Sequence, residues 1–242
     1  GELVAAIALS YLGTKTGGEA NAEILAVYNK IKPYGYTMRT GDPWCAAFWS
    51  ACQIMAGNAK NVPLSASCSR IVADAKTLGM WQENEAVKPK VGWGVLYDWQ
   101  DDGRGDNKGA PDHIGIVYDV DDSYIYVVEG NKGGGVVGKR AILINRRYLR
   151  GFVKPDYAKP EKLDNYPMTP YKGTLPTRLV RYGSAGIQVK RLQAFLNWAI
   201  GAKLKADGKY GKATTEAVIT YQNSSGIKVT GTVGTKTRAK IS

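Results

Sequence analysis

The sequence contains a single histidine, His113, and only three cysteines, Cys45, Cys52 and Cys68, among its 242 residues. So few nitrogen and sulfur ligands barely suffice for one zinc site, which argues against a zinc-dependent enzyme. Because three is an odd number, at least one thiol stays free unless two chains pair, and a disulfide framework is not expected. No apolar run approaches the roughly 20 residues of a membrane span, so no membrane partner is expected.

Acidic residues are scarce near the C-terminus. Residues 178–242 hold 12 lysines and arginines but only two acids, a net charge of +10, whereas the first 177 residues carry +2 of the total of +12. A basic module favours a polyanionic partner, for which nucleic acid and an anionic bacterial wall with its teichoic acids are both candidates. A solvated basic face is the third interpretation.

Prolines gather between two regions of different character. Polar residues, tyrosine and glycine lie between these prolines and show no periodic apolar face. This pattern is typical of an extended, semi-rigid linker. We therefore predict a first domain at residues 1–154, a linker at 155–177 and a second domain at 178–242. The five prolines of this stretch are Pro155, Pro160, Pro167, Pro170 and Pro176.

The first domain changes its hydrophobic period halfway along. Helical spacing favours helices over residues 3–12, 19–32, from 43 onward and 67–78. Short segments rich in β-branched and aromatic residues then predict strands at 93–99, 114–120, 124–128, 141–144 and 151–153. Helices followed by strands indicate an α+β domain with an antiparallel sheet.

The second domain contains an internal repeat. The pattern Gly208, Gly211, Thr214 recurs 23 residues later, and each copy comes just before a helical stretch. An earlier helix is predicted over residues 186–199. Three short helices joined by glycine-rich turns make a small helical bundle of marginal size for independent folding.

Cys45 is expected in the first turn of the third helix. Asp42 is a suitable N-cap and Pro43 a suitable first helical residue, and apolar residues then recur at helical spacing. The helix dipole and free N–H groups favour a thiolate there and provide part of an oxyanion hole. Cys52, two turns later on the same face, is interpreted as a small buried hydrophobe.

His113 begins a strand that a short turn connects to the next one. A hairpin closed by a three-residue loop at 121–123 places position 113 opposite position 131, with Glu129 and Asn131 on one face. Either side chain could then fix the tautomer of the imidazole. A surface histidine at a hairpin end is the alternative. A thiol, an imidazole and an orienting group together follow the logic of a thiol hydrolase.

Three motifs in order resemble the CHAP family, the cysteine, histidine-dependent amidohydrolases/peptidases. They are DPWCAAF at 42–48, DHIGIV at 112–117 and VEGN at 128–131, and the resemblance covers residues 1–154. It implies a papain-like α+β fold in which Cys45 is the nucleophile and His113 the base, supported by Glu129 and Asn131.

Three tryptophans are the expected substrate-binding residues, namely Trp44, Trp93 and Trp99. One departure from the family concerns Trp93, which stands where many CHAP sequences carry aspartate after glycine. Trp93 is interpreted as a packing or cleft-lining side chain.

Residues 183–241 resemble the small helical peptidoglycan-binding domain, through residues that include both glycine–threonine repeats. The pairing of the two domains looks like a phage endolysin or a bacterial autolysin. It implies a monomer that binds bacterial peptidoglycan and anionic wall polymers, rather than nucleic acid. Such a protein acts at the cell wall, either after secretion or after release from the host cytoplasm during phage lysis.

The expected reaction is cleavage of an amide bond in the peptide portion of peptidoglycan through a Cys45 thioester. Glu129 is preferred to Asn131 as the orienting group because a carboxylate also stabilises an imidazolium. An endopeptidase is favoured, with an N-acetylmuramoyl-L-alanine amidase or a non-catalytic wall binder as alternatives. An acyltransferase would use the same residues, whereas a muramidase would use two carboxylates and leave the thiol unexplained.

The loop at residues 98–107 carries four aspartates, Asp98, Asp101, Asp102 and Asp106, with glycines between them. Such carboxylates are calcium ligands, but the loop lacks EF-hand spacing and its terminal glutamate. A solvated acidic loop on the rim of the cleft is the favoured interpretation, so no cofactor is required.

Overall fold

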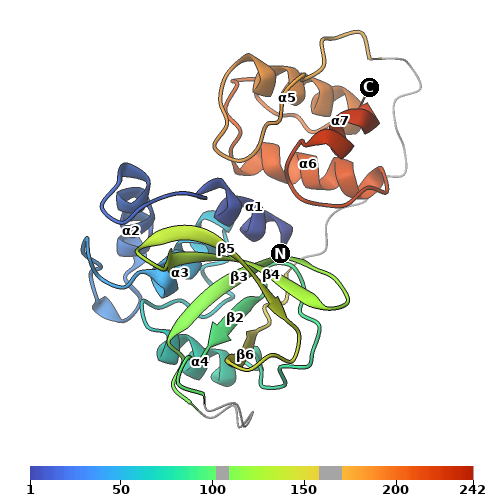
Figure 1. Ribbon diagram of the computed structural model, residues 1–242. Helices are drawn as coiled ribbons and strands as arrows, with labels where there is room; N and C mark the ends of the chain where they lie inside the picture. Colours follow the sequence, from blue (N-terminus) through green and yellow to red (C-terminus); the bar gives the residue numbers. More distant parts are fainter. Residues whose placement is uncertain (102–108, 158–170, 242) are drawn as a thin grey trace. The chain divides into compact units, whose positions relative to one another are not determined.

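The computed structural model describes residues 1–101, 109–157 and 171–241 (Figure 1). The chain divides into two compact units, Leu3–Tyr157 and Ala158–Ser242. Most of the expected linker lies outside the described residues. Within the part of the chain that is described, no helix is both long and apolar enough to cross a membrane.

The first unit begins with four α-helices, as predicted, and one 3₁₀ turn. The third helix starts two residues later than expected, because the Asp42 carboxylate accepts hydrogen bonds from the Arg39 N–H (2.7 Å) and the Tyr36 hydroxyl (3.1 Å). Asp42 therefore closes the preceding turn, and Trp44 takes the N-cap position. The elements are α1 (Glu2–Ser10), α2 (Glu19–Ile31), η1 (Pro33–Gly35), α3 (Cys45–Ala56) and α4 (Cys68–Thr77).

A six-stranded antiparallel sheet follows, with spatial order β1-β6-β2-β3-β4-β5. The α+β prediction is confirmed, and each of the five predicted strands is present. The short β1 gave no periodic signal. The strands are β1 (Trp81–Gln82), β2 (Gly94–Tyr97), β3 (His113–Val120), β4 (Tyr124–Lys132), β5 (Val136–Leu143) and β6 (Leu149–Val153).

The β3–β4 hairpin sets the position of His113. Near His113 the pairing follows the predicted register, in which residue numbers add up to 244, as in Ile116 opposite Val128. Toward the turn a bulge shifts the pairing by one residue, so that Val120 lies opposite Ile125. The bulge accommodates a turn that is longer than predicted. His113 therefore still lies on the predicted face of the sheet.

Helix α3 packs against β3 and β4, and glycines on β4 and β2 come close to its side chains. A Cβ atom on Gly130 would lie 2.5 Å from Cβ of Phe48, and one on Gly94 would lie 3.1 Å from the Trp49 ring. Phe48 and Trp49 are both fully buried. Because these two glycines have no side chains, α3 approaches the sheet closely. This approach fixes the position of its first residue, Cys45.

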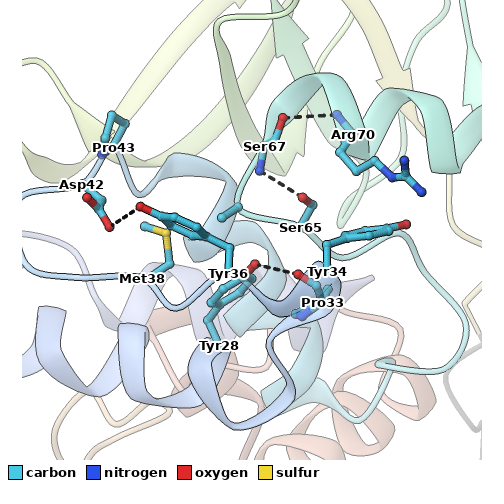
Figure 2. A pocket seen from close by; sticks show the side chains of 11 residues that line it. Tyr28, Pro33, Tyr34, Tyr36, Met38, Asp42, Pro43, Ser65, Ser67 and Arg70 are labelled. Carbon is cyan, nitrogen blue, oxygen red and sulfur yellow. Dashed lines mark hydrogen bonds between the residues drawn. The ribbon is translucent and has the colours of Figure 1, made fainter.

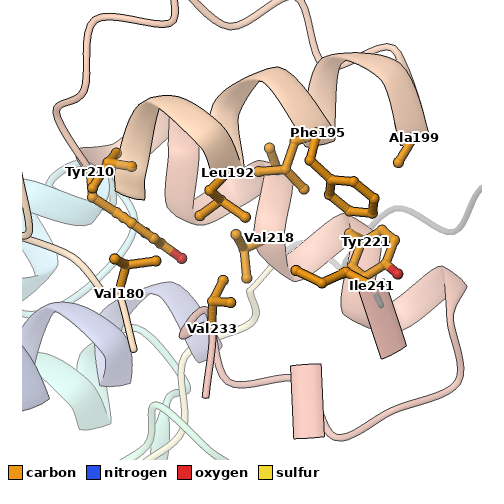
Figure 3. Close-up of a cluster of buried hydrophobic side chains, with 12 residues drawn as sticks. Val180, Leu192, Phe195, Ala199, Tyr210, Val218, Tyr221, Val233 and Ile241 are labelled. Atoms are coloured by element: carbon orange, nitrogen blue, oxygen red, sulfur yellow. The ribbon is translucent and has the colours of Figure 1, made fainter. Parts of the chain in front are cut away.

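The second unit is a three-helix bundle, as predicted, made of α5 (Ile187–Ile200), α6 (Lys212–Ser224) and α7 (Thr235–Ile241). Its apolar side chains, among them Leu192, Val218 and Val233, converge on one core (Figure 3). The glycine–threonine repeat lies before α6 and α7.

A buried glutamine holds the first repeat together. The side-chain amide of Gln193 donates to the Thr214 hydroxyl (3.1 Å), and its oxygen accepts the Gly208 N–H (2.9 Å). Gly208 has a φ of 79°, a conformation that favours glycine. The repeat therefore encodes a turn that needs both a glycine and a glutamine from the preceding helix.

Gln222 holds the second repeat in the same way. Its amide donates to the Thr237 hydroxyl (2.8 Å), and its oxygen accepts the N–H groups of Thr230 (2.8 Å) and Gly231 (3.0 Å). The side chain is fully buried. Each bond therefore satisfies a group that water does not reach.

Gln222→Met is expected to lower the free energy of unfolding of this unit by about 2–4 kcal/mol, because it leaves several buried polar groups without partners. Hydrogen exchange of the α6 amides in the full-length protein measures the effect. The matched control is Gln188→Met, which removes a solvent-exposed bond to the Thr177 N–H (2.8 Å) and should cost less than about 0.5 kcal/mol. Equal losses in the two variants would show that the buried bonds do not hold the turn.

Candidate active site

Cys45 is the first residue of α3, and 6% of its surface is exposed. Its pKa is lowered to about 5, chiefly by the hydrogen bond to Cys68 and further by His113 and the Ile114 backbone, against the opposing effect of burial. The free N–H groups of the first helical turn also favour an anion. Cys45 is therefore a thiolate at neutral pH, which is the nucleophilic form of cysteine.

His113 is the first residue of β3 and is buried. Its Nε2 lies 3.5 Å from Oε2 of Glu129. Burial disfavours the imidazolium, but interactions with Cys45 and Glu129 outweigh it and raise the pKa of His113 to about 9. The structure thus brings three of the predicted residues together as thiolate, imidazolium and carboxylate.

Glu129 is fully buried and is held by an arginine from the neighbouring strand. Nε and Nη2 of Arg140 donate to its two carboxylate oxygens at 2.6 and 3.1 Å. A Cβ atom on Gly115 would lie 2.8 Å from Cγ of Glu129, so this glycine leaves room for the carboxylate. Burial alone would raise the pKa of Glu129, yet His113 and Arg140 lower it. The carboxylate therefore stays ionised beside the imidazole.

Aromatic rings lie against the charged side chains of His113 and Arg140. Trp99 stacks on Tyr97 with ring centroids 4.7 Å apart, and its centroid lies 6.4 Å from that of His113. The guanidinium of Arg140 lies over Trp99 at 5.0 Å. Trp99 remains 37% exposed, so it is the tryptophan of the three that combines free surface with proximity to His113.

The other two predicted tryptophans pack inside the unit. Trp44 is 1% exposed, and its indole N–H donates to the Thr16 hydroxyl at 2.9 Å, so it supports the start of α3 instead of offering a surface to substrate. Trp93 is half-buried and packs against Phe152 with ring centroids 6.3 Å apart. Of the two interpretations of Trp93, packing is the one that its contact supports.

Asn131 lies at an irregularity of β4 and departs from the regular strand that the sequence predicted. The pairing with β5 shifts between Glu129 and Lys132, and Asn131 has a φ of 54°, in the left-handed region that asparagine tolerates. The regular alternation that would place it beside Glu129 therefore ends here. The contact to His113 comes from Glu129.

Sequence reasoning did not identify Cys68 as part of the site. Its Sγ atom lies 3.9 Å from Sγ of Cys45, at the start of α4. All three cysteines are free thiols. Cys52 is fully buried, and burial raises its pKa, as expected for a small hydrophobe. No sequence pattern separates Cys68 from Cys52, because the helices that hold Cys68 and Cys45 meet only in the folded chain.

A cleft of about 500 Å³ lies at the turn that precedes α3. It is lined by the turn that leads into Cys45 and by the residues before Cys68, and Figure 2 shows Tyr34 and Tyr36 along it. Both tyrosines are exposed, and the guanidinium of Arg70 lies 4.0 Å above the Tyr34 ring. The cleft thus offers aromatic faces and a cation near the segments that lead into α3 and α4.

Calcium binding at the aspartate loop was left open by the sequence. Positions 102–106 of that loop lie outside the described residues. Asp98 and Asp101 are described, and the Asp98 carboxylate accepts the Gln100 N–H at 3.0 Å. Among the described residues no group of three or more histidine, cysteine or acidic side chains could hold a metal ion.

Two family models match the chain. Residues 35–131 match the CHAP domain, and residues 185–241 match the peptidoglycan binding domain. Both resemblances read from the sequence are therefore confirmed.

Two solved structures match parts of the chain. The SleB N-terminal domain is 28% identical over 28% of this chain and 93% of its own, with a TM-score of 0.27. A periplasmic domain of the EpsAB fusion protein of the Vibrio vulnificus type II secretion system is 16% identical over 64% of this chain and 67% of its own, with a TM-score of 0.26. No curated protein matches significantly.

Proposed function

We propose that this chain, which joins a CHAP domain to a peptidoglycan-binding domain, is a peptidoglycan hydrolase that cuts an amide bond in the peptide portion of the wall. The observation that carries the proposal is the series of interactions that connects Cys45 to His113, His113 to Glu129 and Glu129 to Arg140. Cys45 is an ionised nucleophile at the start of α3. His113 is an acid whose positive charge the Glu129 carboxylate stabilises, and Arg140 holds that carboxylate in turn. This is the nucleophile, base and orienting group of a thiol hydrolase.

The reaction follows from these positions. The Cys45 thiolate attacks the amide carbonyl, and N–H groups at the start of α3 stabilise the oxyanion. His113 donates its proton to the leaving amine as the C–N bond breaks, which leaves a thioester on Cys45. Neutral His113 then takes a proton from water, which attacks the thioester and regenerates the thiolate. Glu129 orients the ring and stabilises its charged form throughout.

The second unit supplies the binding to the wall. Its residues 178–242 carry a net charge of +10, which suits a polyanionic surface and increases the local concentration of the first unit there. Trp99 and the cleft at the turn before α3 are the surfaces proposed to contact the peptide. The place of action is the bacterial cell wall.

Analysis of digested peptidoglycan tests this function. Purified walls of different cross-bridge types are incubated with the full chain, and amino groups, reducing ends and fragment masses are followed. New amino groups without reducing ends are expected. A new terminus inside a stem or cross-bridge identifies an endopeptidase, and free L-alanine stems identify an amidase. Release of reducing ends alone would contradict the thiol mechanism.

The dependence of kcat/KM on pH is expected to be bell-shaped. Activity should rise as Cys45 ionises, near pH 5, and fall as His113 loses its proton, near pH 9, because the leaving amine needs an acid. The two limbs belong to the interacting pair rather than to either residue alone. The measurement uses a soluble muropeptide at constant ionic strength. A basic limb at the ordinary histidine pKa of 6.5 would show that Cys45 and Glu129 do not hold the imidazolium.

A further inference from the structure

Cys68 is a buried thiol that the proposed reaction does not use. It begins α4 as Cys45 begins α3, and the two sulfur atoms are 3.9 Å apart, within hydrogen-bond distance for sulfur. Cys52 is the comparison, a cysteine that only packs in the core, since burial alone raises its pKa. Cys68 differs because it directly contacts the nucleophile.

A chain of serines connects the middle of α3 with the start of α4. The Ser50 hydroxyl on α3 donates to the Ser65 carbonyl (2.9 Å) and accepts the Ser65 N–H (2.9 Å). The Ser65 hydroxyl accepts the N–H of Ser67 (3.0 Å), which is the N-cap of α4. Ser50 and Ser65 are buried, so these bonds are shielded from water. The start of α4 is thereby tied to α3 and holds Cys68 beside Cys45.

The surrounding charges decide which sulfur keeps its proton. His113, supported by Glu129, favours a negative charge on Cys45. The pKa of Cys68 is raised well above its ordinary value, chiefly by the hydrogen bond to Cys45 and by burial, and further by the negative charges of Cys45 and of Asp112, in the loop before β3. Cys68 is therefore the donor of the pair and Cys45 the acceptor.

We propose that Cys68 is a positioning residue for the proposed reaction, whose S–H donates a hydrogen bond to the Cys45 thiolate and holds this sulfur in its ionised form. This inference rests on the proposed function for its catalytic meaning. It adds a residue that acts through Cys45 without touching the substrate. Its contribution is largest in mildly acidic solution, where a nucleophile without this donor would be protonated.

The experiment measures the ionisation of Cys45 directly. Full-length Cys68→Ala and Cys68→Ser are compared with the parent protein, all carrying Cys52→Ala to remove the unrelated thiol. The rate of Cys45 alkylation by iodoacetamide is followed against pH by peptide mass spectrometry. Cys68→Ala should lower this rate at about pH 6 by about tenfold and leave it nearly unchanged at about pH 9. Cys68→Ser should retain most of the rate, because a hydroxyl also donates.

Two results would overturn the inference. If neither variant changes the pH profile, Cys68 does not stabilise the thiolate. If alanine and serine change it equally, the effect comes from packing and not from a donor. Thermal unfolding of each variant shows whether a loss of stability accompanies the change, and a lower Tm with an unaltered pH profile would assign Cys68 a purely structural role.

Alkylation needs no peptidoglycan, so this test is independent of the proposed function. If no wall is cut but Cys68→Ala still shifts the profile, the hydrogen bond stands and the proposed function fails. If walls are cut and the profile does not move, the function stands and the role of Cys68 fails.

Discussion

Replacing Cys45 by alanine is expected to lower the release of amino groups from peptidoglycan by at least about 10⁴-fold, while binding to the wall is retained. The thiolate forms the covalent bond of the proposed reaction, and alanine has no atom that could replace it. Removal of a nucleophile that acts together with its base abolishes most of the catalysis of such a group.

The matched control for this experiment lies on the same helix. Cys52→Ala removes an identical side chain two turns further along α3, at a fully buried position. It should cost about 1 kcal/mol of stability through a small cavity and leave the rate of hydrolysis nearly unchanged. A comparable loss of activity in the two variants would indicate damage to the helix rather than loss of a nucleophile.

Binding and cleavage are measured separately. Sedimentation with insoluble peptidoglycan reports binding, and amino-group release reports cleavage. If Cys45→Ala cleaves like the parent, the thiol mechanism is wrong, and a carboxylate mechanism that releases reducing ends takes its place. If the parent also binds without cleaving walls of every cross-bridge type, the chain is a wall-binding protein.

Local sequence signals predicted the backbone around the site because they depend on neighbours in the chain. The apolar spacing after Cys45 placed this residue in the first helical turn, even though Trp44 and not Asp42 occupies the N-cap. Likewise, alternation in the hairpin placed Glu129 on the face of His113. The bulge near the turn did not disturb this result, since it lies at the other end of β3.

Contacts between distant elements were not predictable in this way. Arg140 lies one residue before the strand predicted at 141–144, whereas β5 begins at Val136. The run Gly138, Lys139, Arg140 has no polar–apolar alternation and so carries no strand signal. Cys68 lies beside Cys45 where serine bonds tie the start of α4 to the middle of α3, which are distant in the sequence. Asn131 was placed on a regular strand, but its positive φ breaks the alternation on which that placement relied.

Glu129→Gln is expected to lower kcat/KM by about 10²–10⁴-fold, an effect of the size found when the orienting carboxylate of a triad is neutralised. Glutamine keeps the shape of the side chain but removes the charge that stabilises the His113 imidazolium. Because Glu129 helps to raise the pKa of His113, the basic limb of the pH profile should move from about 9 toward lower pH. Arg140 also loses its ionised partner, so stability should fall by about 2 kcal/mol.

A second carboxylate of the chain provides the matched control. Glu83 also pairs with an arginine, through a 2.7 Å contact to Nη1 of Arg150, but its side chain is 47% exposed. Glu83→Gln should change the rate less than about twofold, because Glu83 does not contact His113. Stability should change by about 1 kcal/mol, because solvent screens the half-exposed Glu83 carboxylate although Arg150 is buried. The difference between the two variants isolates the effect of a buried charge beside the imidazole.

The same experiment decides between the two orienting groups that the sequence left open. Asn131→Ala should affect kcat/KM far less than Glu129→Gln, because the 3.5 Å contact to Nε2 of His113 comes from Glu129. If Asn131→Ala were the more damaging change, and the basic limb stayed near pH 9 in Glu129→Gln, Asn131 would be the orienting residue. Glu129 would then serve mainly to neutralise Arg140, and the loss of stability in Glu129→Gln would be its principal effect.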